Sequence, residues 1–374
     1  MNKEIYIQNF KCFASAAKIE MARLTLCAGM NSMGKSTLIQ TILLLRQTYD
    51  TIKKYSGTQR SEFIVFLNDR YALQLGDVNQ IMSSTDSDII NIGADSVRFE
   101  YVRAKDMLSL SLKTNIQSEH MENYKGVFSP HFYYLNAERL GPRNYQAMES
   151  YEQAHCGFHG EHTFDMIYQN AQSRVTEKRC FPHNESKGVK TLEKQVEYWL
   201  DYIIPGTEVS FTSDLAMRLS QMTIRQTAFD TALQSPHNFG FGASYVLPII
   251  VTGLLAEPDS MVIIENPEAH LHPAGQSRIG WFLSQVANDC VQVVIETHSE
   301  HVINGVRLHS LKNGVNPINL CINYFSMDHA REKHVVKRLH LNDCMDILEW
   351  PEGFFDQEAI DLKELRALRS VEKR

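Results

Sequence analysis

The sequence predicts an α/β fold built around a parallel sheet, with a phosphate-binding loop at the end of one strand. An apolar, strand-like run, RLTLCA (23–28), leads into the glycine-rich segment GMNSMGKST (29–37), and a helix-like stretch, LIQTILLLRQ, follows. Two further apolar runs, SMVIIE and VQVVIET, each lie beside a helical segment, as in a parallel sheet that helices cover. With 374 residues, the chain is long enough for about two to three lobes.

Bulk properties narrow the class of protein. A chain with 43% hydrophobic and 22% charged residues and no low-complexity tract has the composition of a globular protein. The net charge of −7 argues against a protein-wide basic field for nucleic acid, although a local basic groove stays open. The segment MNKEIYIQNF lacks the apolar core of a signal peptide, and the longest apolar run, YVLPIIVTGLLA, is too short and too polar to span a bilayer. We therefore expect a cytoplasmic protein without a membrane partner. The spacing of the cysteines does not suggest a disulfide framework, which fits a reducing cytoplasm. The seven cysteines are Cys12, Cys27, Cys156, Cys180, Cys290, Cys321 and Cys344.

The glycine-rich segment gives the strongest functional prediction. Residues 29–36 fit the pattern G-x-x-x-x-G-K-[ST] between an expected strand and an expected helix. Backbone amides of such a loop wrap phosphates, and the amino end of the helix adds positive charge. Lys35 is expected to reach the β- and γ-phosphates and Ser36 to bind Mg²⁺. The sequence has no N-K-x-D motif for guanine, so we expect ATP, with these loop residues binding it: Asn31, Ser32, Gly34, Lys35, Ser36 and Thr37.

Three later segments add to this loop. NFGFGASYVLPII (238–250) places a glycine–serine turn at the start of a helix, where Ser244 and the amides near Gly242 offer a second anion site. VIIENPEAHLHP (262–273) ends a strand in Glu265, and VVIETHSEH ends another just before His298. Taken alone, the turn fits a plain helix start, and His298 fits a core histidine. In this order, however, the segments resemble an ABC-type ATPase head, in which the glycine–serine helix of one subunit closes on the γ-phosphate held by the other.

Five motifs make the resemblance closer: NFKCF, GMNSMGKST, GFGASYVLPI, IENPEAHLHP and ETHSEHVINGVRL look like those of the prokaryotic SMC-like, OLD-related ATPases. YYLNAERLGPR (133–143) and WPEGFFDQ (350–357) resemble one family within these, long catalogued as a domain of unknown function. The resemblance implies a short-insertion ABC head that works as a head-to-tail, ATP-dependent homodimer. It also implies an ATP-driven sensor or regulator for a separately encoded nuclease or toxin, often found at bacterial defence loci. Tyr245 departs from the pattern, because relatives often have glutamine there.

The chain is expected to divide into four segments. Residues 1–135 would form the N-terminal part of the head with a β-rich lobe, and 136–235 an inserted, mainly helical region with an amphipathic helix at TLEKQVEYWLDYII. Residues 236–320 would complete the head, and 321–374 would be a family-specific C-terminal region. About 75 residues follow His298, which we consider too few for the nuclease domain that some OLD proteins carry.

The segment 265–268 leaves two catalytic hypotheses open. Glu265 is expected to hold Mg²⁺, while Asn266 stands where more distant ABC heads have their catalytic glutamate. In one hypothesis Glu268 supplies the missing base, and Pro267 keeps Asn266 extended so that the loop turns Glu268 inward. In the other no base is present; since a general base contributes about 10² to 10⁴ in rate, hydrolysis would then be slow. We favour slow hydrolysis with Glu268 assisting, and His298 completes the expected catalytic set.

Several other side chains allow two interpretations. The histidines and cysteines of HCGFHGEH and CFPH have spacings that zinc could use, although incidental histidines in a turn are favoured. Arg139 and Arg143 are candidates for a phosphate clamp. Phe10 and Phe13 are expected in the core, whereas Lys11 could approach the nucleotide. The D-x-D at 86–88 fits a turn better than a metal site.

Three hypotheses for the function follow. The first is an ATP-gated regulatory ATPase of a bacterial anti-phage defence or toxin system, with a separate effector. The second is an SMC-like DNA-binding or repair ATPase, which predicts salt-sensitive DNA affinity that rises with ATP. The third is an ATP-locked scaffold that does not hydrolyse its nucleotide.

Overall fold

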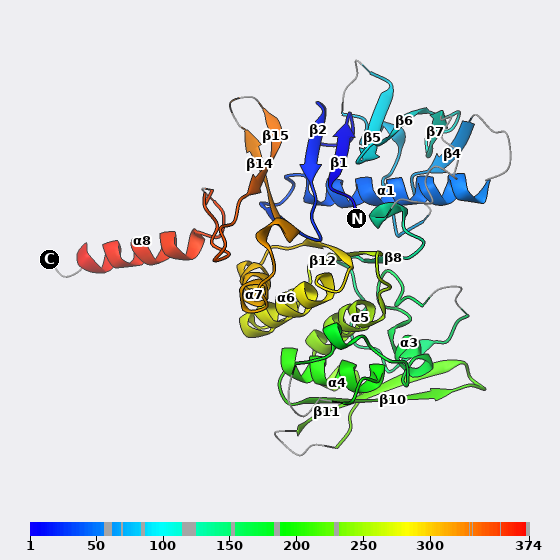
Figure 1. Ribbon diagram of the computed structural model, residues 1–374, viewed down its shortest axis with the longest axis vertical. Helices are drawn as coiled ribbons and strands as arrows, with labels where there is room; N and C mark the ends of the chain where they lie inside the picture. Colours follow the sequence, from blue (N-terminus) through cyan, green and yellow to red (C-terminus); the bar gives the residue numbers. More distant parts are fainter. Residues whose placement is uncertain are drawn as a thin grey trace.

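The computed structural model describes residues 1–55, 62–68, 70–83, 87–113, 125–150, 154–182, 188–227, 232–328, 330, 332–351 and 353–371. Within these ranges the chain forms a mainly parallel six-stranded sheet, an antiparallel six-stranded sheet and a three-stranded sheet (Figure 1). None of the helices in these ranges is long and apolar enough to cross a membrane.

The mainly parallel sheet has the strand order β15-β14-β3-β13-β12-β8. All neighbouring pairs in it are parallel except β14 and β15. The strand that leads into the phosphate loop therefore lies inside the sheet, between β14 and β13. The six strands are β3 (Leu24–Gly29), β8 (Phe132–Leu135), β12 (Met261–Glu265), β13 (Gln292–Glu296), β14 (Leu320–Asp328) and β15 (Lys333–Leu339).

Helix α1 (Lys35–Lys54) lies between one face of this sheet and the antiparallel sheet (Figure 1). Alternate residues of β12 face opposite sides, as the period of a strand requires: Met261 and Ile263 join the core around α1, whereas Val262 and Ile264 join the core on the other face. The antiparallel sheet has the order β2-β1-β5-β6-β7-β4. Its elements are β1 (Glu4–Gln8), β2 (Ala17–Glu20), β4 (Glu62–Phe66), β5 (Ile89–Ala94), β6 (Val97–Arg103) and β7 (Ser109–Lys113), with the short helix α2 (Val78–Ile81) beside them.

The other face of the parallel sheet is covered by α5 (Phe241–Leu255), α6 (Pro273–Ala287) and α7 (Glu300–Lys312). The inserted region packs below them (Figure 1). It differs from the expectation of a mainly helical segment, because its described residues form a three-stranded sheet as well as two α-helices. The expected amphipathic helix is present as α4 (Leu192–Ile203). The remaining elements are α3 (Thr163–Gln169) and the sheet of β9 (Tyr145–Ala147), β10 (Thr207–Asp214) and β11 (Leu219–Gln226).

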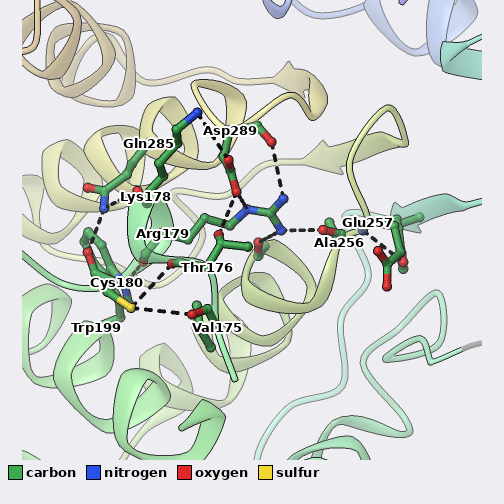
Figure 2. Close-up of polar contacts among 12 residues, drawn as sticks. Val175, Thr176, Lys178, Arg179, Cys180, Trp199, Ala256, Glu257, Gln285 and Asp289 are labelled. Atoms are coloured by element: carbon green, nitrogen blue, oxygen red, sulfur yellow. Dashed lines mark hydrogen bonds and ion pairs between the residues drawn. The ribbon is translucent and has the colours of Figure 1, made fainter. Parts of the chain in front are cut away.

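Arg179 fixes the inserted region to the helices of the head (Figure 2). It lies in the short 3₁₀ helix Glu177–Arg179 and is almost fully buried. Its guanidinium donates to the Gly253 and Ala256 carbonyls at the end of α5 and pairs with Asp289, just after α6, at 2.9 Å. The indole of Trp199 on α4 in turn donates to the Arg179 carbonyl at 2.9 Å. The buried guanidinium thus links the ends of α5 and α6, and the Trp199 bond joins α4 to the same point.

The C-terminal part of the chain first adds two strands to the main sheet and then forms an extension. β14 pairs directly with β3, and β15 pairs with β14. After β15 the chain reaches α8 (Gln357–Val371), which projects from the body (Figure 1). The described ranges also contain 3₁₀ helices at Gly126–Phe128, Pro236–Asn238 and Pro317–Asn319.

Candidate nucleotide site

The phosphate loop has the backbone that its glycines predict. Gly29, Ser32 and Gly34 have φ angles of 139°, 63° and 105°, which expose successive amides on the inside of the loop. Gly29 is required by a close approach, because a Cβ there would lie 2.2 Å from the Phe325 carbonyl oxygen of β14. α1 begins at Lys35 without a side-chain cap, so its first amides are available to an anion. The loop therefore fits the phosphates of a nucleotide.

Lys35 is folded back onto the loop. Its Nζ donates to the carbonyl oxygens of Gly29 and Met30, at 2.8 and 2.7 Å. Burial lowers the pKa of this ammonium, while the carboxylate of Glu296 acts in the opposite direction. Phosphate oxygens would replace the two carbonyls as stronger, charged acceptors.

Two glutamates lie at the strand ends next to the phosphate loop. Glu265 and Glu296 occupy the same register position at the ends of β12 and β13. Ser36 Oγ lies 3.1 and 3.4 Å from the two carboxylate oxygens of Glu296, and the Tyr134 hydroxyl donates to Glu265 at 2.9 Å. Burial and the neighbouring Glu265 raise the pKa of Glu296 to about 7. A serine hydroxyl with carboxylate oxygens is a donor set of the type that Mg²⁺ prefers.

Glu296 was missed by the sequence analysis. The pattern that could have found it is simple, because both apolar runs, MVIIE and VVIE, end in glutamate. The carboxyl ends of parallel strands share one edge of the sheet, so two such glutamates are expected at one site.

Glu268 is turned inward, toward the end of β13. One of its carboxylate oxygens accepts from Thr297 Oγ1 at 2.8 Å, and the other accepts from the His298 backbone N–H at 2.6 Å. Burial raises the pKa of Glu268. The His298 ring keeps substantial solvent exposure, and partial burial together with Lys35 lowers its pKa. Glu268 thus positions the backbone that carries His298.

The expectation that Pro267 keeps Asn266 extended is wrong. Asn266 has a φ of 45°, in the left-handed region. A tight turn forces this conformation: the Asn266 N–H donates to the Glu296 carbonyl at 2.8 Å, and the Ala269 N–H donates to the Asn266 carbonyl at 3.1 Å. Asparagine tolerates left-handed backbone better than most residues. Its Oδ1 is buried and has no hydrogen-bond partner among the residues that the structure describes.

Arg139 supports the backbone of the site instead of offering a phosphate clamp. It is 3% exposed. Its guanidinium donates to the carbonyls of Glu265 and Asn266, both at 2.7 Å, and to those of Asn136 and Tyr245 at 2.8 and 3.1 Å. Arg143 of the same motif is exposed.

The glycine–serine helix start forms a separate surface. α5 begins after Gly240, and a 490 Å³ cavity is lined there by Gly240, Gly242 and residues around His270. Ser244 Oγ is shielded from solvent and has no hydrogen-bond partner within the described ranges. The aromatic ring of Phe241 is half exposed.

The other side chains with two possible interpretations are the aromatic pair near the start of the chain, the histidine and cysteine segments, and the D-x-D segment. Phe10 and Phe13 are buried as expected, and Lys11 Nζ donates to Gln40 of α1 at 2.7 Å. The rings of His155 and His162 are in contact, but the described residues contain no group of three potential ligands for a metal, and His183 lies outside them. Of the D-x-D segment, Asp86 is also outside them, and Asp88 is an exposed partner of Arg103.

The sheet order and the strand-end site define a P-loop ATPase fold of the ABC type. Two ATPase family profiles match the chain: "AAA ATPase domain" over residues 1–154 and "AAA domain, putative AbiEii toxin, Type IV TA system" over residues 201–304. Residues 315–365 match a third, "Protein of unknown function (DUF3696)". No curated protein matches the sequence.

Among solved structures, the chain is similar to heads of SMC proteins. An SMC head bound to the C-terminal winged-helix domain of ScpA is 11% identical with a TM-score of 0.50, covering 91% of this chain and 98% of that one. An SMC head domain from Pyrococcus furiosus is 10% identical with a TM-score of 0.49, covering 98% and 99%, and one from Thermotoga maritima is 11% identical with a TM-score of 0.44, covering 91% and 99%. The chain is therefore similar to AAA-type ATPase domains in its sequence and to an SMC head in its fold.

Proposed function

We propose that this chain is an ATP-binding, slowly hydrolysing ABC-type ATPase that acts as the dimeric regulatory subunit of a bacterial defence or toxin system with a separate effector. Slow ATP hydrolysis is supported by the conformation and hydrogen bonds of residues 265–268. The position after Glu265 holds an amide in a left-handed turn, and both oxygens of Glu268 are already used by Thr297 and His298. A poorly activated water makes the ATP-bound state long-lived, and occupancy itself becomes the signal.

The residues fit the following roles. Lys35 and the amides of residues 31–37 hold the phosphates, and His298 is assigned the contact with the γ-phosphate. Ser36, Glu265 and Glu296 hold Mg²⁺, which when bound neutralises the charge of the β- and γ-phosphates. Gly242 and Ser244 serve the nucleotide of the second subunit in a head-to-tail homodimer. For that role the shielded Ser244 hydroxyl must turn outward.

A regulatory role in defence is supported by the match to the AbiEii-type AAA profile and by the resemblance of the motifs. It is tested by expressing the chain with its neighbouring genes and challenging the cells with phage. Protection that is lost in Lys35→Ala, and kept in a variant of exposed Lys53→Ala, supports the proposal. Protection that does not depend on Lys35, or none with any neighbouring gene, contradicts it.

Slow hydrolysis is tested with purified protein in single turnover. We expect Asn266→Glu to accelerate hydrolysis by about 10-fold or more if the water lacks only a base. The exposed Glu257→Gln is the control, and its rate should equal that of the wild type. A fast wild type, or an unchanged rate in Asn266→Glu, argues against an unactivated water as the cause of slow turnover.

A further inference from the structure

Helix α8 projects from the body of the protein (Figure 1), and its apolar side chains are exposed. All residues from 357 to 369 are exposed, including Leu362, Leu365 and Leu368 at 45%, 47% and 59%. An isolated helix of this length is marginal in water, and most helical stability in proteins comes from packing an apolar face. A contact outside the single chain is therefore expected.

The base of α8 is held firmly. Phe354 is buried at 2% exposure, and its ring packs against Tyr324 of β14 with 5.3 Å between centroids. The Gly353 N–H donates to Asp356 at 2.9 Å, just before the helix begins. α8 is thus attached to the strand that neighbours the phosphate-loop strand β3.

The charges of α8 are spaced so that they cannot pair within the helix. The acidic residues recur at every third position in the first half, and the basic residues do so in the second half: Glu358, Asp361 and Glu364, then Lys363, Arg366 and Arg369. No acid lies three or four positions from a base, the separations at which helical side chains meet. Like charges do lie three positions apart, which destabilises the isolated helix. Acidic residues near the start of α8 and basic residues near its end interact favourably with the helix dipole. This stabilisation is confined to the first and last turns of the helix.

The charges of α8 are complementary to those of a second, antiparallel α8, with the point of symmetry between residues 363 and 364. Inverting the order of the helix between residues 363 and 364 exchanges each acid with a base: Glu358 with Arg369, Asp361 with Arg366, and Glu364 with Lys363. The two central leucines, Leu362 and Leu365, also exchange with each other, whereas Leu368 exchanges with Ala359. At about 100° per residue, Leu362 and Leu365 bound an arc of about 60° that also contains Glu358 and Arg369. These four residues share one face.

We propose that α8 pairs antiparallel with α8 of a second copy of this chain, across a two-fold axis between residues 363 and 364. Such an isologous contact places leucines at its centre and ion pairs at both ends. It does not involve the nucleotide, so it is distinct from ATP-driven closure of the heads. Two short helices bury less than a standard interface, so the contact is weak alone and sensitive to salt.

The proposal is tested by charge reversal in the full chain, with Lys35→Ala in every sample to remove ATP-dependent assembly. One variant carries Glu358→Lys, Asp361→Lys and Glu364→Lys, and the other carries Lys363→Glu, Arg366→Glu and Arg369→Glu. Each alone should self-associate about 10-fold or more weakly than the parent, because the ion pairs at both ends of the contact become repulsive. Lys363 and Glu364 lie on the far side of the helix and contribute less. A mixture of the two should associate again, since each supplies the charges that the other lacks.

Sedimentation equilibrium over a wide range of concentrations measures the association. Lys53→Glu with Lys54→Glu, at the exposed end of α1, is the control for net charge and should behave as the parent. A parent that stays monomeric throughout overturns the proposal, as do variants that associate like the parent. Loss in both variants without recovery on mixing also overturns it, because an all-basic α8 and an all-acidic α8 would then fail to pair.

Discussion

Glu265 and Glu296 are direct neighbours in the register of two parallel strands, and it is the carboxylate of Glu296 that accepts a hydrogen bond from the phosphate-loop residue Ser36. Glu265 is instead engaged by the hydroxyl of Tyr134. Two buried carboxylates side by side disfavour each other's ionisation, and the pKa of Glu296 is raised to about 7 as a result of burial and Glu265. A divalent cation held by the two carboxylates would relieve this cost, which supports the proposed role of the pair in holding Mg²⁺.

Removal of the Glu296 charge should weaken magnesium-dependent binding. We expect Glu296→Gln to lower the affinity for ATP with Mg²⁺ by about 10-fold or more, because an amide is a poor partner for this hard cation. Binding without Mg²⁺ should change less. Calorimetry with and without Mg²⁺ measures both, and the exposed Glu257→Gln is the control. Equal losses in the two conditions would show that Glu296 acts on the loop and not on the ion.

Lys35 should dominate nucleotide affinity. In Lys35→Ala the phosphates lose their main side-chain charge, and we expect ATP affinity to fall roughly 10- to 100-fold, as for the loss of a hydrogen bond to a charged group. The measurement is calorimetric titration with ATP, with circular dichroism as a check of folding. Unchanged affinity in a folded variant would refute the assignment of the loop.

Ser244→Arg should abolish ATP-driven dimerisation without abolishing ATP binding. The variant is expected to bind ATP nearly as the wild type does, because the residue would serve the nucleotide of the second subunit, and to lose ATP-driven dimerisation. Light scattering with and without ATP measures the mass. Normal dimerisation together with normal hydrolysis would count against the head-to-tail arrangement.

Glu268 and Glu265 should affect hydrolysis differently. Since both oxygens of Glu268 accept hydrogen bonds from the end of β13, we expect Glu268→Gln to slow single turnover by less than about 10²-fold. A drop of 10²-fold or more would identify Glu268 as the base itself. Glu265→Gln should weaken activity that depends on Mg²⁺ in either case. If both variants hydrolyse ATP like the wild type, segment 265–268 is not catalytic.

Acid should destabilise the fold through His309. This residue is 2% exposed, contacts Ser284 Oγ at 2.8 Å, and burial lowers its pKa to about 4. In the unfolded chain it binds a proton near pH 6.5, so between about pH 4 and 6.5 protons favour unfolding, and stability rises with pH across this window. The full effect is roughly 3 kcal/mol. Urea unfolding of His309→Gln across this range should show a shallower dependence on pH than the wild type, whereas the exposed His340→Gln should not. Equal slopes in all three proteins would exclude His309 as the cause.

The sequence alone determined the features that depend on neighbouring residues. The strands at 4–8, 24–29, 261–265 and 292–296, the phosphate loop, and helix α4 all follow from local periodicity and glycine spacing. Glu268 was expected to turn inward, and it does, although not through an extended Asn266.

The tertiary structure decided what depends on contacts between distant segments. Glu296 joins the site because β13 pairs with both β3 and β12. The glutamate at the end of each apolar run indicates a shared sheet edge, but only the strand order places Glu296 beside Ser36. Arg139 faces backbone carbonyls of β12 and α5, which no local pattern identifies. The inserted region acquires a sheet because β9, 60 residues or more before β10 and β11, pairs with β11. Local propensity selects elements, but hydrogen bonds and burial between distant elements select the residues that meet at a site.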